Sequence, residues 1–299
     1  MRKLEHCRLL ILGVSGMLGS ALYRYYSEMP NYTVYGTGKN YLSRMRGEKF
    51  VRQKNSLLYL DVESLDDLKA VFKVAKPDVV INCIGLVKQA KHGDNAILSI
   101  KINSLFPNIL AQLCVKSKSR LVHFSTDCVF SGERGEYSEG DIADSRDLYG
   151  LSKLLGEVCD SNCLTLRTSL IGHELYTNHS LIDWFLSQKG KVSGYRKAIF
   201  SGFPTYEIAR ILDQFILPNN ELSGLYHLSS SPISKFELLN LVSKEYGISV
   251  RIEPVDAPSV NRVLISKKFK AATGYSPQSW PDFIKLMHEC YKKYEISSK

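Results

Sequence analysis

Two short segments of the chain hold side chains that could place a proton on a carbonyl oxygen. Ser125 and Thr126 offer hydroxyls at the end of an apolar run, and Tyr149 and Lys153 follow, four residues apart, in a segment predicted to be helical. Residues i and i+4 share one face of a helix. An ammonium beside a phenol favours the phenolate and lowers the phenol's pKa from about 10. Because the same Tyr–Lys spacing occurs once more in the chain, the surrounding elements must decide whether this pair is functional.

Those elements alternate between short apolar strands and amphipathic helices up to about residue 170. Strands are predicted at 8–12, 32–37, 57–62, 78–83, 120–125 and 164–169, and helices up to residue 27 and at 64–75, 97–116 (interrupted by Pro107) and 149–159. Beyond this point we expect helices at 180–187, 206–215, 235–246 and 280–294, strands at 224–228 and 250–254, and a loop over a ligand at 254–266. Near-continuous apolar strands alternating with helices predict an α/β fold with a Rossmann-type doubly wound parallel sheet.

A glycine pattern follows the first strand and opens the first helix. Gly13, Gly16 and Gly19 stand three residues apart, and the turn also contains Ser15, Met17 and Leu18. Glycines in this context permit a tight turn, close approach of a pyrophosphate, and close helix–sheet packing. The helix N-terminus then presents N–H groups to the phosphates. We therefore expect residues 1–170 to form an NAD(P)-binding domain to which 200–229 return, and 171–299 to form mainly a smaller substrate-binding lobe.

The end of the second strand bears on the choice between the two nicotinamide cofactors. A carboxylate there binds the ribose 2′-hydroxyl of NAD, whereas a basic residue accommodates the 2′-phosphate of NADP. The segment 36–40 reads Gly-Thr-Gly-Lys-Asn, with Lys39 and no acid. The sequence therefore predicts a preference for NADPH, with NADH as the alternative; an exposed loop lysine is the plainer interpretation of Lys39.

Charge and cysteine content narrow the class of protein. The 299 residues carry a net charge of +9, but Lys and Arg are dispersed, which favours small phosphate-bearing ligands over nucleic acid. The seven cysteines, including Cys159 and Cys163, lack the spacing of a disulfide framework or a zinc site, so no metal is expected. Reduced thiols indicate a cytoplasmic protein. No apolar run is long enough to span a membrane, so we expect a soluble chain.

With these elements in order, the chain resembles the extended short-chain dehydrogenase/reductases. Within them it is most similar to the dTDP-4-dehydrorhamnose reductase group, which reduces 4-keto-6-deoxy sugars on nucleotide diphosphates. The resemblance rests on GVSGMLGS at 13–20, Asp61-Val62, INCIG at 81–85, Asn103 with Pro107, STDCVFSG at 125–132, YGLSK at 149–153, LRTSLIG at 166–172 and Pro204-Thr205. The glycine pattern and the Tyr–Lys pair are typical of the whole superfamily, whereas the Ser-Thr-Asp-x-Val-Phe string is more specific to this group.

The resemblance implies roles for individual residues. Thr126 would be the catalytic hydroxyl in preference to Ser125, Tyr149 the acid and Lys153 its partner. The cofactor would be contacted by Asp61 and Val62 at the adenine, by Cys83, Ile84 and Gly85 at the inner ribose and phosphates, and by Tyr149 and Lys153; Asn103 would support the site or be an ordinary polar helix residue. The implied reaction is NADPH-dependent reduction of the C4 keto group of a nucleotide-diphosphate 6-deoxy-4-ketohexose for surface polysaccharide synthesis.

The chain departs from the group at Cys128, where an aromatic residue is usual. Loss of the ring would enlarge the sugar pocket, and we hypothesise that it admits an acetamido group, as in a UDP-N-acetyl sugar. The 4,6-dehydratases place Glu at this position, so Cys128 disfavours dehydration. The substrate contacts that we expect are Lys88, Asp127, Cys128 and Arg262, with His92, His173, Glu174 and Arg196 as further candidates.

Two other functions remain open from the sequence. The group also resembles the non-catalytic partner of methionine adenosyltransferase, so an NADP-bound regulatory subunit is the first alternative. A nucleotide-sugar epimerase is the second, and it fits the matched string less well. Retention of Thr126, Tyr149 and Lys153 favours an enzyme. The partners expected are a nucleotide-diphosphate sugar and, as an assembly compatible with the sequence, a second copy of the chain.

Overall fold

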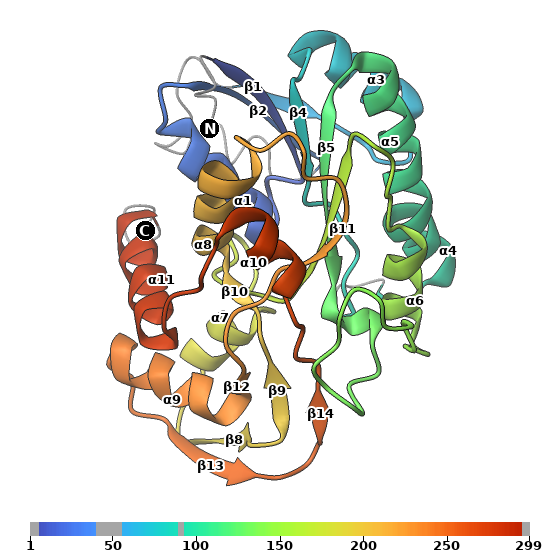
Figure 1. The fold of residues 1–299 in the computed structure, drawn as a ribbon. Helices are drawn as coiled ribbons and strands as arrows, with labels where there is room; N and C mark the ends of the chain where they lie inside the picture. The colour runs from blue at the N-terminus through green and yellow to red at the C-terminus, as the bar shows by residue number, and fades with distance from the viewer. Residues whose placement is uncertain (1–5, 40–55, 89–92, 295–299) are drawn as a thin grey trace. The chain divides into compact units, whose positions relative to one another are not determined.

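A computed structural model describes residues 6–39, 56–88 and 93–294, and the chain divides into two compact units. The first unit comprises Met1–Ser125, Asp147–Leu166 and Ala209–Leu225, and the second comprises Thr126–Arg146, Arg167–Ile208 and Tyr226–Lys299. Figure 1 traces both units along the chain.

A seven-stranded sheet forms the centre of the first unit. Its order is β11-β6-β5-β4-β1-β2-β3, and the pairs β1–β2, β1–β4, β2–β3 and β4–β5 are parallel. The strands are β1 (Cys7–Leu12), β2 (Tyr32–Gly38), β3 (Ser56–Tyr59), β4 (Val79–Asn82), β5 (Arg120–Thr126), β6 (Cys163–Thr168) and β11 (Gly224–His227). The Rossmann-type α/β fold predicted from the sequence is confirmed, and the expected strand at 224–228 joins this sheet.

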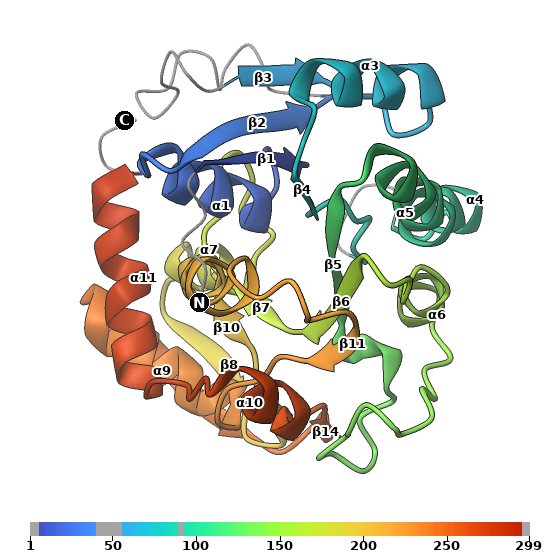
Figure 2. The same ribbon diagram turned by 45° about the horizontal axis from the view of Figure 1, so that its top comes forward.

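Helices flank the sheet and supply most of its buried apolar contacts. Figure 2 shows α3 (Leu65–Ala75), α4 (Ala96–Ser99) with α5 (Phe106–Ser117), and α6 (Leu148–Leu155) on one side of the strands, and α1 (Met17–Ser27) on the other. Leu10, Leu12 and Val80 of the strands pack in one cluster with Leu68 of α3 and Leu110 of α5. Ser64 caps α3 by accepting a hydrogen bond from the Asp67 amide, which satisfies a donor of the first turn.

The long helix before β5 is continuous, which corrects the predicted interruption at Pro107. Between α4 and α5 the chain forms a π-helical turn, η1 (Ile100–Leu105), and Pro107 falls in the first turn of α5. Proline lacks an N–H and its ring crowds the carbonyl four residues earlier. The wider π turn immediately before it lets the helix continue, because a π turn takes up one extra residue.

Several predicted elements are shorter in the structure, among them the third strand and the helix that carries Tyr149. The third strand ends at Tyr59, before Asp61, and α6 ends at Leu155 rather than at residue 159. Gly156 is the C-cap of α6, and a Cβ added there would lie 1.9 Å from the Asn103 carbonyl oxygen. This close approach of α6 to η1 requires glycine, which is poorly suited to continue a helix.

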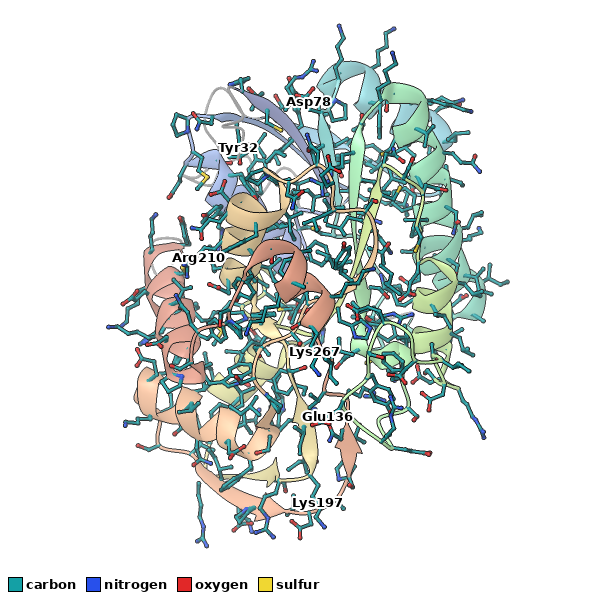
Figure 3. The ribbon with its side chains drawn as sticks, in the orientation of Figure 1. Tyr32, Asp78, Glu136, Lys197, Arg210 and Lys267 are labelled. Carbon is teal, nitrogen blue, oxygen red and sulfur yellow. The ribbon has the colours of Figure 1, made fainter. Side chains whose placement is uncertain are left out.

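Side-chain bonds at the edges of the first unit tie distant segments together. Tyr32 and Asp78 are labelled in Figure 3. The Tyr32 hydroxyl donates to Asp213 Oδ1 at 2.7 Å. Asp78 accepts from the Arg8 backbone amide and forms two bonds to its guanidinium, at 3.1 and 2.7 Å, which joins the start of β1 to the start of β4 and holds the pKa of the Asp78 carboxyl below its usual value.

The second unit is built from short sheets and helices. Its strands are β7 (Leu170–Ile171), β8 (Lys191–Tyr195), β9 (Ala198–Phe200), β10 (Phe203–Pro204), β12 (Ile233–Ser234), β13 (Arg251–Val255) and β14 (Val260–Asn261), paired as β10–β7, β12–β9–β14 and β13–β8. Its helices are α7 (Leu181–Leu186), α8 (Thr205–Ile211), α9 (Lys235–Tyr246), α10 (Lys267–Thr273) and α11 (Trp280–Tyr294); a second π turn, η3 (Leu212–Ile216), follows α8 within the first unit. The predicted bounds of α9 and α11 are confirmed, whereas β14 lies within the expected loop 254–266.

One helical stretch among the described residues, Ala96–Ser117, is long and apolar enough to cross a membrane by length and composition. Its side chains Phe106, Leu110, Ala111 and Cys114 lie in the buried cluster beside the sheet. Packing against the sheet therefore accounts for its apolar character.

Candidate active site

The glycine turn has the backbone geometry that a phosphate-binding turn requires. Gly13 has a φ of +82°, a left-handed conformation that favours glycine, and its carbonyl accepts from the Gly16 amide at 3.1 Å. Gly16 is the N-cap of α1, and no N-cap side chain accepts a hydrogen bond from the first turn of the helix. A Cβ on Gly19 would lie 2.2 Å from the Gly13 carbonyl oxygen, so glycine is needed for α1 to approach the turn. Ser15, Met17 and Leu18 complete the turn, with Leu18 buried.

The end of β4 lies directly beside this turn. The Cys83 amide donates to the Leu12 carbonyl at 3.1 Å, and a Cβ on Gly13 would lie 2.8 Å from Ile84 Cγ1. Asn82 orients the segment, because its side-chain oxygen accepts from the Ile84 amide at 3.1 Å. Gly13 and the Cys83-Ile84 pair, which the sequence assigns to one cofactor, are therefore neighbours. Glycine at position 13 lets the two segments pack this closely, because a Cβ there would collide with Ile84.

Lys39 and Asp61, two residues expected to contact the cofactor, form an ion pair with each other. The Lys39 ammonium holds the pKa of the Asp61 carboxyl below its usual value, and Asp61 raises that of Lys39. Both side chains are partly exposed, which limits the contribution of the pair to stability. The carboxylate brings an acid to the end of β2, where the local sequence shows none. Val62 follows, partly buried against the core.

Lys153 is buried on α6 and points to β5. Its Nζ donates to the Phe124 carbonyl oxygen at 2.7 Å, and the residue is 5% exposed. Burial disfavours the charged ammonium and lowers the pKa of Lys153 to about 8, while Glu157 and Cys83 act in the opposite direction. Tyr149 lies one turn earlier on the same helix and is partly buried. The bond to Phe124 therefore anchors the helix face that carries the phenol.

Ser125 is engaged elsewhere, which distinguishes it from Thr126. Its hydroxyl donates to Glu157 Oε1 at 2.6 Å. Glu157 is a residue that the sequence-based prediction missed, and its carboxylate favours the charged form of Lys153. The spacing of Lys153 and Glu157, again four residues, was the available signal. It was overlooked because the helix ends between them, at Leu155.

Asn103 holds the loop that follows β4. On the π turn η1, its side-chain oxygen accepts from the Leu86 amide at 2.8 Å and its amide donates to the Leu86 carbonyl at 2.9 Å. A third bond, 3.0 Å, reaches the Ser152 hydroxyl on α6. A Cβ on Gly85 would lie 3.6 Å from Asn103 Oδ1 and 3.9 Å from Lys153 Nζ. Asn103 thus has more contacts than an ordinary polar helix residue, and it brings Gly85 next to the Tyr–Lys helix.

Lys88 lies beside Tyr149. Its Nζ bonds Asp147 Oδ2 at 2.8 Å and is 6.0 Å from the centre of the Tyr149 ring. Asp147 is the N-cap of α6 and accepts from the Gly150 amide, so one carboxylate both caps the helix and positions the lysine. The first unit therefore groups Lys88, Tyr149, Lys153 and Asn103.

The remaining substrate-contact candidates lie in the second unit, which begins at Thr126. The Thr126 hydroxyl bonds the Asp127 carboxyl at 3.1 Å and accepts from the Cys128 amide at 3.1 Å. Arg262 donates through Nε to the Phe130 carbonyl at 3.0 Å, and its charge acts on buried Asp127. Cys128 is partly buried. Thr126, Asp127, Cys128 and Arg262 thus belong to one cluster.

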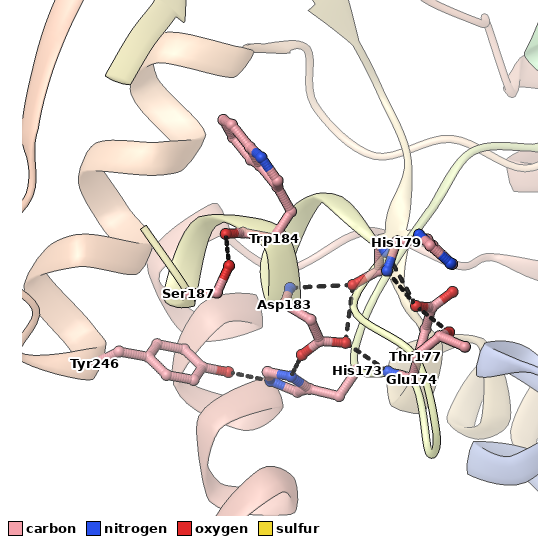
Figure 4. Close-up of polar contacts among 9 residues, drawn as sticks. His173, Glu174, Thr177, His179, Asp183, Trp184, Ser187 and Tyr246 are labelled. Atoms are coloured by element: carbon pink, nitrogen blue, oxygen red, sulfur yellow. Dashed lines mark hydrogen bonds and ion pairs between the residues drawn. The ribbon is translucent and has the colours of Figure 1, made fainter. Parts of the chain in front are cut away.

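Other candidates from the sequence have internal roles. His173 bonds Asp183 Oδ1 at 2.5 Å and the Tyr246 hydroxyl at 2.8 Å (Figure 4). The Glu174 carboxylate bonds the Thr177 hydroxyl and the His179 and Ser180 amides within its own loop. Arg196 pairs with Asp256. These contacts order the loop after β7 and the β8–β9 turn; His92 lies outside the described residues.

The described parts of the chain contain no cluster of side chains that could hold a metal ion. No group of three or more His, Cys, Asp or Glu side chains is placed there as metal ligands would be. All seven cysteines are free thiols. The carboxylates near the Tyr–Lys pair are instead engaged separately, Asp147 with Lys88 and the α6 N-terminus and Glu157 with Ser125.

Comparison with known proteins identifies the family. The family described as RmlD substrate binding domain matches residues 7–292. The dTDP-4-dehydrorhamnose reductase of Aggregatibacter actinomycetemcomitans is 26% identical over 93% of this chain and 97% of its own length, and the methionine adenosyltransferase 2 subunit beta of Danio rerio is 24% identical over 81% and 74%. The crystal structure of dTDP-4-dehydrorhamnose reductase from Bacillus anthracis, in complex with NADP, matches with a TM-score of 0.77 at 20% identity, covering 95% and 99% of the two chains. The chain belongs to the RmlD substrate binding domain family and is an RmlD-like member of the extended short-chain dehydrogenase/reductases.

Proposed function

We propose that this protein is an NADPH-dependent oxidoreductase that reduces the C4 keto group of a nucleotide-diphosphate 6-deoxy-4-ketohexose. The observation that carries the proposal is the buried Lys153, bonded to the Phe124 carbonyl one helical turn from Tyr149. The named relatives and the NADP-bound structural neighbour support the same reaction class. A place in surface polysaccharide synthesis follows from that class of product, and the free thiols suit a cytoplasmic enzyme.

The mechanism assigns a separate task to each side chain. NADPH, when bound, supplies the hydride for the sugar's C4 carbon. Tyr149 gives its phenolic proton to the C4 oxygen as negative charge develops there. Lys153, held by Phe124, supplies the positive charge that favours the resulting phenolate. Thr126, at the end of β5, donates a hydrogen bond to that oxygen and stabilises charge that appears only in the transition state.

The residues of the first unit suit a dinucleotide. The Gly13–Gly19 turn packs closely against the Cys83-Ile84 segment, and its glycines carry no side chain that would keep a ligand from the backbone. We propose that the α1 N-terminus faces the pyrophosphate. We propose further that Lys39 exchanges Asp61 for the 2′-phosphate of NADPH, while Asp61 would suit the 2′-hydroxyl of NADH when the pair opens.

Cys128 bears on which sugar is used. A cysteine where relatives of this group have an aromatic residue leaves space, and we propose a UDP-N-acetyl sugar as the alternative to dTDP-4-keto-rhamnose. Replacing Cys128 by Tyr is expected to lower kcat/KM for the N-acetyl substrate by at least about tenfold while sparing the dTDP substrate, because overpacking penalises only the larger group. Steady-state kinetics with both substrates test this, with Cys128→Ala as the control for loss of the thiol. Equal effects on both substrates would contradict the pocket argument.

The reaction itself is tested by a substrate screen. A panel of 4-keto sugar nucleotides, with dTDP or UDP and with or without a C2 acetamido group, is incubated with NADPH and with NADH. Substrate-dependent loss of absorbance at the reduced nicotinamide band, followed by NMR of the product, identifies the sugar and its C4 configuration. Absence of turnover with every member of the panel would contradict the proposal.

A regulatory subunit is the second candidate, because the methionine adenosyltransferase beta subunit is a relative. The two functions separate in one comparison: an enzyme oxidises NADPH only with a keto sugar, whereas a regulatory subunit co-purifies with a synthetase and alters its kinetics. The arrangement of Tyr149 and Lys153 favours the enzyme.

A homodimer is our proposal for the assembly. Ile97 and Leu105 on the α4–η1 segment and Leu155 on α6 are exposed, at 70%, 52% and 67%, on elements that pack together in the first unit. Exposed apolar side chains of this number on neighbouring helices favour burial against a second copy. Light scattering on the purified protein measures the mass directly, and a monomer at all concentrations would contradict the proposal.

A further inference from the structure

The hydrogen bonds of Thr126 leave it no proton to give to a substrate. A threonine hydroxyl has one hydrogen and two lone pairs. One lone pair accepts from the Cys128 amide at 3.1 Å, and the hydrogen is directed to Asp127 Oδ1 at 3.1 Å. As long as Asp127 is an acceptor, the hydroxyl is committed to it.

The hydrogen-bond pattern of Thr126 changes if the Asp127 carboxyl carries a proton. Asp127 then becomes the donor, and the Thr126 oxygen accepts two hydrogen bonds, one from the Cys128 amide and one from Asp127. Both lone pairs are used, and the single hydrogen of the hydroxyl is free to point at another acceptor. Asp127 takes this proton from the solvent and keeps it, Thr126 keeps its own hydrogen, and the direction of the bond between the two side chains reverses.

The surroundings of Asp127 bear on its protonation. The carboxyl is buried, at 5% exposure, and burial raises its pKa above the usual value. The groups that oppose this are the Arg262 charge and hydrogen bonds from Thr126, Ser169 and Cys128. Arg262 is itself bonded to the Phe130 and Ser131 carbonyls, which fixes its guanidinium near the cluster. The effect of burial on the pKa of Asp127 is larger than the opposing effect of these groups, so the pKa is raised.

We propose that Asp127 is a positioning residue that acts in its protonated form, donating to Thr126 so that the Thr126 hydroxyl can donate to the substrate oxygen. This inference rests on the proposed reductase function. It assigns Asp127 a task beyond substrate contact, and it explains why a carboxyl is tolerated in a buried position beside a hydroxyl.

The kinetic test measures a ratio across pH. With dTDP-4-keto-rhamnose and NADPH, kcat/KM of Asp127→Asn divided by that of the wild type is expected to rise with pH, by up to about tenfold per unit above the pKa of Asp127. The Asn side chain keeps a permanent N–H donor, whereas the wild type loses its donor on ionisation. Only the change of this ratio with pH is tested, so the absolute kcat/KM of either enzyme does not affect the result.

Measuring the same ratio in two variants of Thr126 shows whether the effect depends on its hydroxyl. In Thr126→Ser, which retains it, the ratio is expected to rise as before. In Thr126→Val, which lacks it, the ratio is expected to be flat, because no hydroxyl remains to be positioned. A flat ratio with Thr126 present, or a rise that persists in Thr126→Val, would overturn the proposal.

A measurement without substrate separates this inference from the function. Protein labelled with ¹³C at the Asp carboxyls is titrated by NMR, and the Asp127 signal is assigned by its loss in Asp127→Asn. Its midpoint is expected above the ordinary value of about 3.9, because burial disfavours the carboxylate. Thr126→Ser should leave the midpoint in place. If no keto sugar is reduced, the proposed function fails; an Asp127 midpoint at or below the ordinary value overturns the positioning role whatever the activity.

Discussion

At the scale of single residues, the structure separates side chains that look equivalent in the sequence. Ser125 and Thr126 are adjacent hydroxyls, yet Ser125 donates to Glu157 and Thr126 bonds Asp127. Successive residues of a strand point to opposite faces, so two neighbours meet different partners. This difference in partners, together with the family resemblance, supports our assignment of Thr126 as the hydroxyl that faces the substrate.

The phenol of Tyr149 is the residue whose loss should matter most to the chemical step. Tyr149→Phe removes the proton donor but keeps the ring, so we expect kcat to fall at least about 100-fold. Affinity for NADPH, measured by fluorescence titration, should change less than about threefold, because we propose that the glycine turn is the main contact of the cofactor. Near-normal turnover in this variant would remove Tyr149 from the mechanism.

At the scale of elements, α6 and β5 together set the charge state of Lys153. Lys153 lies at the end of α6, its ammonium bonds the β5 carbonyl at Phe124, and Glu157 follows just beyond the C-cap. Ser125 of β5 holds Glu157 in place. The strand therefore acts on Lys153 twice, once directly and once through the carboxylate.

This arrangement predicts how activity depends on pH. The pKa of Lys153 is lowered to about 8, so its ammonium is present below that pH and is lost as the pH rises through it. We expect kcat to decline above about pH 8. Removing the charge of Glu157 by Glu157→Gln takes away a group that raises this pKa, so the decline should begin at lower pH. Ser125→Ala, which keeps the carboxylate, is the control and should move the profile less; an unmoved profile in Glu157→Gln would contradict the coupling.

The contact of α6 with the π turn gives a second prediction at this scale. Gly156→Ala would place a methyl group 1.9 Å from the Asn103 carbonyl oxygen. We expect it to lower the free energy of unfolding by more than about 2 kcal/mol, since backbone must move to accept it. Gly140→Ala is the matched control: nothing lies within 4 Å of the added atom, and its effect should stay within about 0.5 kcal/mol. Urea unfolding curves of the two variants check this, and equal midpoints would contradict the close packing.

At the scale of the whole molecule, the chain passes repeatedly between its two units. β5, β6 and β11 each begin in the first unit and end in the second. The proposed catalytic residues are divided in the same way, with Tyr149 and Lys153 in the first and Thr126 in the second. Chains with more than one compact unit depart from two-state unfolding, so we expect more than one thermal transition.

Cofactor binding should therefore stabilise the protein selectively. NADPH at one hundred times its Kd contributes about 2.7 kcal/mol to the unit that binds it, so the corresponding thermal transition should move upward. NADH at the same concentration should move it less if Lys39 binds the 2′-phosphate, and Lys39→Glu should abolish the difference. Differential scanning calorimetry measures both shifts. Equal shifts by NADPH and NADH in the wild type would contradict the assignment of Lys39.

The sequence by itself determined the order of strands and helices along the first unit, the glycine turn, and the placement of Tyr149 and Lys153 on one helix. These features depend on local periodicity and on spacings of a few residues, which the chain displays directly. The glycine turn at Gly13–Gly19 and the helices α9 and α11 were predictable for this reason. The third strand and α6 were predicted too long, because apolar character continues beyond the points where Tyr59 and Gly156 end the elements.

Only the tertiary structure decided which polar groups meet. The bonds from Asn103 to Leu86 and Ser152, from Lys153 to Phe124 and from Ser125 to Glu157 join residues 17 to 49 positions apart. Such pairs depend on how strands are ordered and helices docked, and no local pattern encodes them. The sequence alone therefore identifies Tyr149 and Lys153 as a phenol–ammonium pair. The packing of α6 against β5 and η1 sets the burial of Lys153 and its charge state.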